Sequence, residues 1–526
     1  PNPCHNEMLV LTALLAVSPN TKASVDLLAA AEPFAKNWQR CVGSGHMLLG
    51  TRADWQSQLA LAVNELGFGA IRGHGLLDDD MGVLPAKGRL EFYNVDQVFD
   101  AVHALRLRPV VELSFTPAAL VACGKAGEQP CDYAFGGSGA YKGLAMPPDS
   151  FAEWEGLVAS VAEHLVGRYG LDAVSEWHFE VWNELWGVPF PEPYMRLYNA
   201  SARGLKSVSP RLRVGGPATM ALEEVEPFVA ACRASSTPVD FVSSHLYPTS
   251  PICDTNATAR DPDCFAHKVL SASDAVHKAG LPFFLTEYNN GLGDSSRDDA
   301  SAAAFVVRNV GLLASVDLVS WWTFSDIFEE AWMASAPFHN GYGLMTVHGI
   351  RKPAWRAFEM LASLGDYRLP VSGNVSPADG SSTVSLLATR PQGSGGGALK
   401  GPLGGSRRLW DAAGQSQGHV VLLLSNFHRN RSACTAQNVS LAVIHRSDAT
   451  LPPTARAFRV DEAHANPLAE WHRQGQPIYP DSSQLSKLHD ASRVRLAEAV
   501  PLHRLSPTQS VMHFTMPPFS VLKLEL

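Results

Sequence analysis

The feature that most constrains the fold of this chain is a regular alternation of short apolar runs with helical patterns, which begins near Cys41. Such alternation is typical of βαβ units, in which helices connect the parallel strands of one sheet. The expected strands are the eight apolar runs Arg40–Ser44, Ala70–Gly73, Pro109–Ser114, Trp177–Asn183, Arg213–Pro217, Asp240–His245, Pro282–Tyr288 and Leu318–Phe324. The expected helices are Arg52–Leu66, Val95–Leu105, Ser150–Tyr169, Pro191–Val208, Glu223–Ala234, Phe265–Ala279, Ala300–Ala314 and Lys352–Leu364. This α/β pattern predicts a closed (β/α)8 TIM barrel over residues 40–365.

The pattern changes after Gly365. Glycine, serine and proline become frequent, and helical periodicity fades. Strand-like runs take its place at Val420–Leu424, Val439–Ile444, Ala457–Val460 and Val521–Leu526. We therefore expect an accessory all-β sandwich domain over residues 366–526. Within it, Arg390–Ser406 is rich in glycine and is predicted to be a flexible surface loop.

Residues 1–39 precede the predicted barrel and are free to add a strand or two to the sandwich. Within them, Met8–Val17 has the length of a signal-peptide core, although no basic residue precedes it. It is either a signal-like run or a buried strand or helix of the mature chain. No apolar run reaches the roughly 18 residues that would indicate a membrane-spanning helix, so we expect no membrane association.

The chain of 526 residues is longer than one hydrophobic core usually holds, which favours a barrel-sized domain with a smaller one. Its hydrophobic content of 46% and charged content of 18% are typical of globular proteins. The net charge of −9 comes without long runs of one sign, so we expect no nucleic-acid partner. A small neutral ligand suits this composition best.

Two pairs of cysteines are close in the sequence within loop-like segments, and no C-x-x-C metal spacing occurs. They predict the disulfides Cys123–Cys131 and Cys253–Cys264. The pairing of the other four stays open: Cys4, Cys41, Cys232 and Cys434. Five Asn-x-Ser/Thr glycosylation tripeptides begin at Asn199, Asn256, Asn374, Asn430 and Asn438. We expect a glycoprotein that is secreted or resides in a secretory-pathway or lysosome-like compartment.

A TIM barrel carries its chemistry at the C-terminal ends of its strands. Six of the eight expected strands end in groups suited to binding or proton transfer. These ends are Gly73-His74-Gly75, Glu112-Leu113-Ser114-Phe115, Asn183-Glu184, His245-Leu246-Tyr247, Glu287-Tyr288 and Trp321-Trp322. A lone histidine at a strand end is more often structural than functional, but the convergence of these groups on one face predicts a site.

Two of these ends carry a glutamate after an apolar run, Glu184 after Trp177–Asn183 and Glu287 after Leu281–Thr286. A carboxylate at the end of a buried strand is best explained if the strand opens into a polar site. Two carboxylates at two strand ends are the minimum that hydrolysis of a glycosidic bond requires. We therefore predict Glu184 and Glu287 as catalytic residues of a glycoside hydrolase.

In these and neighbouring stretches the chain resembles glycoside hydrolase family 39, whose members include β-xylosidases and α-L-iduronidase, and the β-xylosidases more closely. The matching stretches follow one another in the family's order, and the likeness extends from about residue 38 to the C-terminus, including Asp461–Pro467 in the β domain. In the barrel they are 41–45, 71–77, 108–112, 179–184, 214–218, 239–243, 285–289 and 322–330. The resemblance implies a TIM barrel with a β-sandwich and glycosidase activity without a cofactor.

Carried over position by position, the resemblance implies that Glu184 is the acid/base, Glu287 the nucleophile and Asn183 a partner of the sugar 2-hydroxyl. The other positions that it implies line the subsite of the non-reducing sugar: His74, His245, Tyr247, Trp322, Glu329 and Glu330. The chain departs from the family where Leu185-Trp186 replace the usual Pro-Asn or Pro-Asp after the acid/base. Trp186 is bulky, and it could narrow or redirect the subsite of the leaving group.

Glycosidic cleavage needs one ionised and one protonated carboxyl group. Thr286, Tyr288 and Asn289 are expected to hold Glu287 ionised by hydrogen bonding. Apolar Trp182 and the charge of Glu287 are expected to raise the pKa of Glu184. We predict a retaining double displacement with carboxyl groups about 5 Å apart.

The expected reaction is exo-hydrolysis that releases terminal β-xylose from xylo-oligosaccharides or xylosides. The segment His245–Ser250 contains no lysine or arginine for a sugar carboxylate, which favours a neutral pentose over iduronate. Other family 39 activities stay as alternatives: α-L-iduronidase, β-galactosidase and arabinosidase. A non-catalytic carbohydrate-binding barrel is the alternative of another class. No H-E-x-x-H motif or closely spaced His/Asp cluster is evident, so no metal or cofactor is expected.

Overall fold

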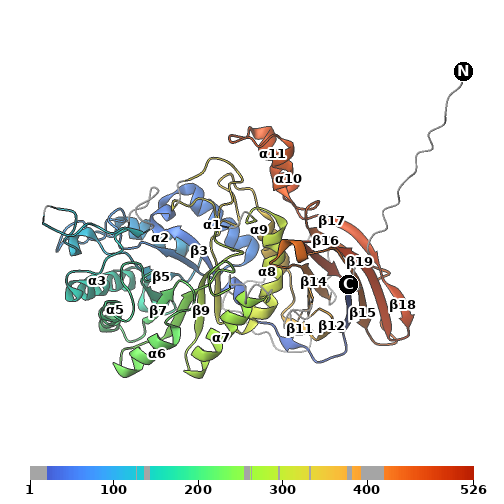
Figure 1. The fold of residues 1–526 in the computed structure, drawn as a ribbon, viewed down its shortest axis with the longest axis horizontal. Coiled ribbons are helices and arrows are strands. Elements are labelled where there is room, and N and C mark those ends of the chain that lie inside the picture. The colour runs from blue at the N-terminus through green and yellow to red at the C-terminus, as the bar shows by residue number, and fades with distance from the viewer. Residues whose placement is uncertain are drawn as a thin grey trace, which may run out of the picture.

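The computed structural model describes residues 21–125, 127–134, 143–253, 261, 263–293, 296–330, 333–375, 382–391 and 420–526. An α/β barrel and a β domain lie side by side along its longest axis (Figure 1). Several features discussed above fall outside the described residues: Met8–Val17, Cys4, Asn256 and the stretch 392–406.

Eight parallel strands close into a barrel in the order β10-β3-β4-β5-β6-β7-β8-β9, which confirms the predicted fold. Each strand coincides with one of the eight predicted apolar runs, and all are almost completely buried because helices cover the barrel. They are β3 (Cys41–His46), β4 (Ile71–His74), β5 (Val110–Leu113), β6 (His178–Val181), β7 (Arg213–Thr219), β8 (Phe241–His245), β9 (Phe283–Tyr288) and β10 (Leu318–Trp321).

The predicted helices are all present around the barrel (Figure 1). Their local signals are visible: the Ser150 side chain caps α3 by accepting a hydrogen bond from the Glu153 N–H, and Gly67 ends α1 with a φ of 79°. The helices are α1 (Ala53–Leu66), α2 (Tyr93–Ala104), α3 (Phe151–Tyr169), α4 (Leu171–Val174), α5 (Tyr194–Val208), α6 (Val225–Ala234), α7 (Cys264–Lys278), α8 (Ala300–Leu312) and α9 (Pro353–Ala362).

The β domain consists of two sheets whose facing side chains share one hydrophobic core. The seven-stranded sheet runs in the order β17 (Leu496–Pro501), β16 (Thr454–Val460), β20 (Ser520–Glu525), β14 (Val421–Asn426), β13 (Val384–Arg390), β11 (Tyr367–Leu369) and β2 (Glu32–Pro33). The five-stranded sheet runs in the order β12 (Val371–Gly373), β1 (Thr21–Asp26), β15 (Gln437–Ile444), β19 (Gln509–Met516) and β18 (His503–Ser506). The N-terminal segment does add strands to the sandwich, since β1 pairs with β12 and β15 and β2 pairs with β11.

The prediction that this domain is all-β was wrong in one place. Two helices, α10 (Pro467–Arg473) and α11 (Ser482–Ala491), stand between β16 and β17 and project from the domain (Figure 1). Both are short, so their periodicity is weak in the sequence, although Asp481 and Gln484 form a capping box that starts α11. Trp471 of α10 and Leu488 of α11 form a small hydrophobic cluster with Phe338 and Ile350 of the barrel domain.

The two domains are joined by helix α8, which packs against β13, β14 and β20. Arg308 on this helix is fully buried and forms an ion pair with Asp263, with an Nε–Oδ1 distance of 2.6 Å. It also donates to the backbone oxygens of Ser382 and Thr383, both at 3.1 Å, which precede β13.

The predicted disulfides Cys123–Cys131 and Cys253–Cys264 are both confirmed. Cys41, Cys232 and Cys434 are buried as free thiols. Stable disulfides are typical of proteins from oxidising compartments. Within the residues that the structure describes, none of the helices has the length and apolar character needed to cross a bilayer.

A pair of glycine substitutions tests the close packing of the barrel strands. A Cβ on Gly215 of β7 would lie 2.4 Å from the backbone oxygen of Phe241, so Gly215→Ala is expected to lower the free energy of unfolding by about 1–3 kcal/mol. A Cβ on Gly167 of α3 would meet no atom within 4 Å, so Gly167→Ala is expected to raise it by about 0.5–1 kcal/mol. Urea denaturation of both variants measures these changes, and equal effects would contradict the strand packing described.

Candidate functional site

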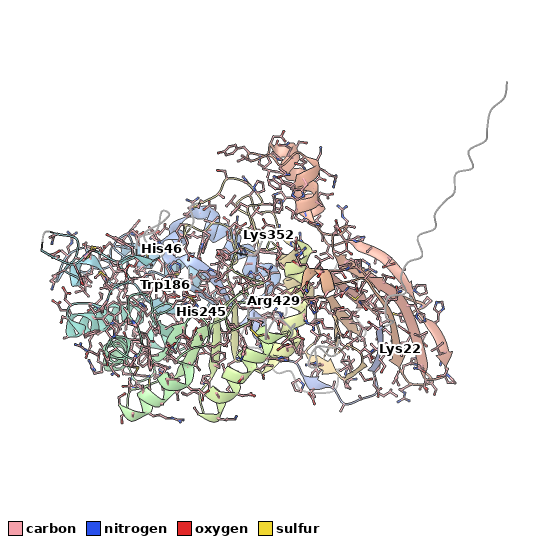
Figure 2. The ribbon with its side chains drawn as sticks, in the orientation of Figure 1. Lys22, His46, Trp186, His245, Lys352 and Arg429 are labelled. Carbon is pink, nitrogen blue, oxygen red and sulfur yellow. A yellow bond between two sulfur atoms is a disulfide. The ribbon has the colours of Figure 1, made fainter. Side chains whose placement is uncertain are left out.

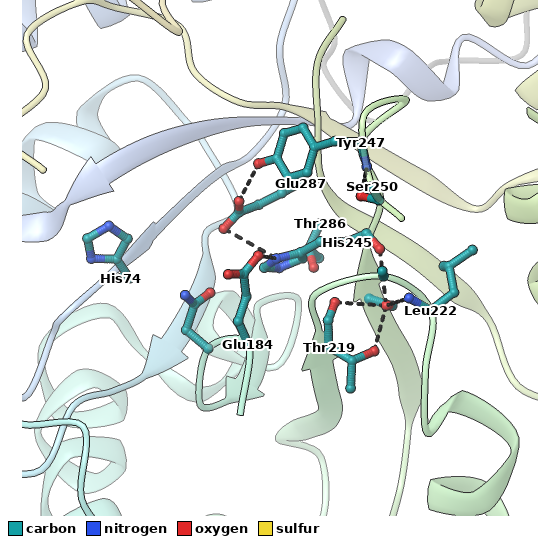
Figure 3. A network of polar contacts seen from close by, with 12 residues as sticks. His74, Glu184, Thr219, Leu222, His245, Tyr247, Ser250, Thr286 and Glu287 are labelled. Carbon is teal, nitrogen blue, oxygen red and sulfur yellow. Dashed lines mark hydrogen bonds and ion pairs between the residues drawn. The ribbon is translucent and has the colours of Figure 1, made fainter. Parts of the chain in front are cut away.

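The two predicted glutamates meet at the C-terminal end of the barrel. Glu184 lies three residues after the end of β6, and Glu287 lies in β9. His245 Nδ1, at the end of β8, is 2.9 Å from Glu184 Oε1 and 3.6 Å from Glu287 Oε1 (Figure 3). These three ligand atoms all lie within 4.8 Å of one another. The two carboxyl groups therefore face a single small space, and their side chains are only 10% and 6% exposed.

A buried arginine that the sequence analysis missed holds this end of the barrel together. Arg72 Nη1 lies 2.7 Å from Glu287 Oε1, and its Nε lies 2.5 Å from Glu180 Oε2. Its Nη2 lies 2.5 Å from Glu112 Oε2 and donates to Asn183 Oδ1 at 3.0 Å. Charged residues inside apolar strands were the available signal, because an unpaired charge is costly in a core.

The two glutamates have different environments. Burial, followed by the negative charge of Glu287, raises the pKa of Glu184 well above its ordinary value. Burial also raises the pKa of Glu287, but the Arg72 guanidinium and the Tyr247 hydroxyl, which donates to Glu287 Oε2 at 2.6 Å, oppose this rise. Of the pair, Glu287 is therefore the group that ionises first, and Glu184 keeps its proton to higher pH.

The predicted donors to Glu287 were wrong. The Thr286 hydroxyl donates to Glu180 Oε1 at 2.8 Å, and the Asn289 amide donates to the Trp322 backbone oxygen at 3.1 Å. The Tyr288 ring stacks on Phe265 of α7, with a centroid distance of 5.9 Å, and so lies on the helical side of the strand. Sequence neighbours on a strand point in different directions, so the groups that serve Glu287 come from other strands.

The backbone around Glu184 has the left-handed conformation at three residues. Trp182, Glu184 and Leu185 have φ values of 72°, 50° and 55°, in a region that non-glycine residues rarely occupy. The Glu184 N–H donates to the Ala218 oxygen at 2.8 Å and anchors the turn to β7. Such strain is common where a fold has to aim a functional side chain.

The remaining predicted residues form a second cluster beside the glutamate pair. His74 Nε2 lies 2.6 Å from Glu330 Oε1, and the rings of His74 and Trp322 are 5.8 Å apart. Burial lowers the pKa of His74 well below its ordinary value and raises that of Glu330 well above its ordinary value, so burial favours the neutral form of each group. The guanidinium carbon of Arg72 lies 5.9 Å from the Trp322 ring centroid, which links this cluster to the glutamate pair.

Glu329 is held differently from Glu330. Its Oε1 accepts a hydrogen bond from the His46 backbone N–H at 2.9 Å. Its Oε2 is buried and has no hydrogen-bond partner within the described ranges. Buried acceptors are usually satisfied, so this oxygen suits a hydroxyl group from a ligand.

Two groups of described residues have ligand atoms close enough together to hold a cation. One is Glu184, His245 and Glu287. In the other, His46 Nε2 lies 3.4 Å from Asp78 Oδ2 and 3.2 Å from Asp80 Oδ1. Burial acts to lower the pKa of His46, but Asp80 and Asp78 raise it above its ordinary value, which favours an ion pair among these three side chains. No sequence motif indicated this group, because only the barrel brings the ends of β3 and β4 together.

Replacing Arg72 tests the buried network without reference to any substrate. Arg72→Met leaves buried carboxylates without their cation and is expected to lower the free energy of unfolding by about 3–5 kcal/mol. Burial then raises the carboxyl pKa values in the folded state above those in the unfolded state. The stability of the variant is therefore lost as the pH rises, and the deficit should be larger at about pH 8 than at about pH 5.

Denaturation of Arg72→Met at both pH values measures this effect. Arg108→Met is the matched control, because Arg108 pairs with Glu176 at 3.5 Å and the side chains are 43% and 47% exposed. It should change stability by less than about 0.5 kcal/mol. Equal stability of the two variants would show that Arg72 does not compensate the buried carboxylates.

A family model and individual relatives of this chain all point to the same family. The model of glycosyl hydrolases family 39 matches residues 21–504. A beta-xylosidase of Geobacillus stearothermophilus is 35% identical over 487 residues, which cover 88% of this chain and 87% of the relative. A beta-xylosidase of Caldicellulosiruptor saccharolyticus is 32% identical over 482 residues, which cover 88% and 89%.

More distant relatives also match over most of the chain. The alpha-L-iduronidase of Homo sapiens is 25% identical over 565 residues, which cover 94% of this chain and 78% of the relative. The structure of a GH39 beta-xylosidase from Caulobacter crescentus matches with a TM-score of 0.73 at 26% identity, over 96% of this chain and 99% of that one. These matches and the paired glutamates agree with hydrolysis of glycosides, and the chain belongs to glycoside hydrolase family 39.

Proposed function

We propose that this glycoside hydrolase is a retaining exo-β-xylosidase, which releases β-xylose from the non-reducing end of xylo-oligosaccharides or xylosides. The observation that carries the retaining mechanism is the separation of the two glutamates, whose nearest oxygens lie within 4.8 Å. Retaining enzymes have carboxyl groups about 5–5.5 Å apart, whereas inverting enzymes need about 6.5–9.5 Å to admit a water molecule.

In the first step, Glu287 attacks the anomeric carbon and forms a glycosyl ester, while Glu184 gives its proton to the oxygen of the leaving group. In the second step, Glu184 takes a proton from a water molecule that attacks the anomeric carbon, and Glu287 leaves as a carboxylate. The protonation order inferred above supports these roles. Arg72 and Tyr247 orient the Glu287 carboxylate, and His245 contacts Glu184.

The polar groups of the site suit a neutral sugar. Arg72 already faces three carboxyl groups and the Asn183 oxygen, so it is not available to a sugar carboxylate. Since that oxygen already accepts a hydrogen bond from Arg72, Asn183 can offer its amide N–H groups to the sugar 2-hydroxyl. Glu329 and Glu330 offer carboxyl groups for hydrogen bonds with further hydroxyls. A uronic acid such as iduronate would place its carboxylate among carboxyl groups.

The names of the relatives also support xylose as the substrate. The two curated relatives with 32% and 35% identity are named as beta-xylosidases, whereas the alpha-L-iduronidase relative has 25% identity. The proposal therefore ranks xylose before iduronate, galactose and arabinose.

Hydrolysis of nitrophenyl glycosides tests the substrate. The expected order of kcat/KM places the β-xyloside first, ahead of the α-arabinoside, β-galactoside and α-iduronide. Proton NMR should detect β-xylose as the first-formed anomer. A preference for the iduronide would refute the proposed substrate, and first-formed α-xylose would refute the retaining mechanism.

The pH profile tests the role assigned to Tyr247. Removing its hydroxyl in Tyr247→Phe takes away a hydrogen bond that stabilises the charged form of Glu287, so the pKa of Glu287 rises. The acidic limb of kcat/KM against pH should therefore move upward by about one pH unit.

Tyr169→Phe is the matched control for this profile. The Tyr169 hydroxyl donates to Asp100 at 2.8 Å, so the substitution removes a bond of the same kind on the helices outside the barrel. Its pH profile should equal that of the wild type. An unshifted acidic limb in Tyr247→Phe would separate Tyr247 from the ionisation of Glu287.

A further inference from the structure

The chain segment directly after Glu184 carries a firmly held tryptophan. The indole Nε1 of Trp182 donates to the Trp186 backbone oxygen at 2.9 Å. The next residue, Gly187, has a φ of 63°, and a Cβ there would lie 1.6 Å from the Ala145 oxygen, so the backbone packs tightly against the loop around Ala145. Trp186 is therefore fixed from both sides in a defined position.

The Trp186 ring is the outer end of an aromatic group that starts in the core. It stacks on Phe115 with a centroid distance of 6.1 Å and an interplanar angle of 12°. Phe115 is fully buried and meets the edge of Trp182 at 5.1 Å. Trp182 is fully buried too, whereas Trp186 is only partly buried. Of these three residues, Trp186 alone keeps some exposed surface, and it lies two positions after Glu184.

The same group reaches the predicted sugar subsite on its other side. The Phe115 ring lies 6.3 Å from the ring of His74, which contacts Glu330. An aromatic wall thus runs from His74 through Phe115 to Trp186. Figure 2 shows Trp186 and His245 in the barrel half of the molecule, far from Lys22 in the β domain.

The proposed reaction relates the position of Trp186 to the leaving group. The acid/base protonates the leaving oxygen, so the leaving group departs on the side of Glu184. Trp186 follows Glu184 by two residues and is held rigidly. Aromatic rings bind the apolar faces of sugar and aryl rings well, and a rigid ring costs little entropy to order.

We infer that Trp186 is a specificity-determining residue that stacks against a cyclic leaving group, either a pyranose or an aryl ring. This inference rests on the proposed function, since it takes Glu184 as the acid/base. It goes beyond that function by assigning the wall of the leaving-group subsite, where the sequence departs from the family pattern.

The experiment compares leaving groups with and without a ring. Trp186→Ala is expected to lower kcat/KM about 10-fold for xylobiose and nitrophenyl β-xyloside, mainly through KM. Xylosyl fluoride has a leaving group of one atom, so its kcat/KM should stay unchanged. Trp186→Phe keeps an aromatic ring and should restore most of the loss for both ring-bearing substrates.

Leu185→Ala is the matched control, because Leu185 is a partly buried apolar residue next to Glu184. It should leave the ratio of kcat/KM between xylobiose and xylosyl fluoride unchanged. An equal loss with the fluoride in Trp186→Ala would mean that the substitution acts on the sugar subsite or the fold and not on the leaving group. A loss with xylobiose alone, which needs a proton from Glu184, would mean that Trp186 only positions Glu184, because nitrophenolate and fluoride leave with little acid assistance. No loss with any substrate would exclude the stacking contact.

The wild-type enzyme separates this inference from the proposed function. If it hydrolyses none of the xylosides, the proposed function fails, and the comparison is then made with the fluoride and the nitrophenyl glycoside of the sugar that it does prefer. A ring-dependent loss in Trp186→Ala would support the inference with that sugar, and its absence would overturn it.

Discussion

The site depends on one buried cation. Arg72 is fully buried, and its guanidinium faces Glu112, Glu180 and Glu287 together with the Asn183 oxygen. Gathering three carboxyl groups around one positive charge would be costly if all were ionised. Burial raises the pKa of Glu112 to about 8, so this carboxyl keeps its proton at neutral pH. Protonation of Glu112 reduces the negative charge around the guanidinium, and Arg72 can hold strands β4, β5, β6 and β9 in a common arrangement at the catalytic end of the barrel.

The same low-polarity environment gives the surrounding groups distinct protonation states. The imidazoles of His74 and His245 are neutral, because burial lowers the pKa of each well below its ordinary value. Glu184 lies beside the neutral His245 and the negative charge of Glu287, which favours a protonated carboxyl. Glu287 alone of the pair receives hydrogen bonds from Arg72 and Tyr247. Two carboxyl groups of the same type thereby differ in their protonation, as the proposed proton donor Glu184 and the proposed nucleophile Glu287 require.

The loop after β10 carries Glu329 and Glu330, and contacts outside the barrel centre hold it in place. Fully buried Lys352, just before α9, lies 2.6 Å from Asp298 Oδ1 and 2.7 Å from Asp326 Oδ2. Asp326 also accepts the Gly343 N–H at 2.7 Å, which closes the loop that carries Glu329 and Glu330. Farther along the same loop, Phe338 and Ile350 pack with Trp471 and Leu488 of the α10–α11 hairpin. The β domain thus supports a loop on the active-site face through a contact that could not be predicted from its sequence.

The sequence by itself determined the barrel, the sandwich, both disulfides and the two glutamates at strand ends, because these follow from local periodicity and from residues at fixed places along the chain. The tertiary structure decided which side chains face one another. Arg72 lies 215 positions from Glu287 in the sequence, and barrel closure sets their contact. For the same reason Thr286, a neighbour of Glu287 in the sequence, bonds to Glu180. Hydrophobic patterns locate each strand from the local sequence alone. The partners of a charged side chain depend on how eight strands meet around a common axis.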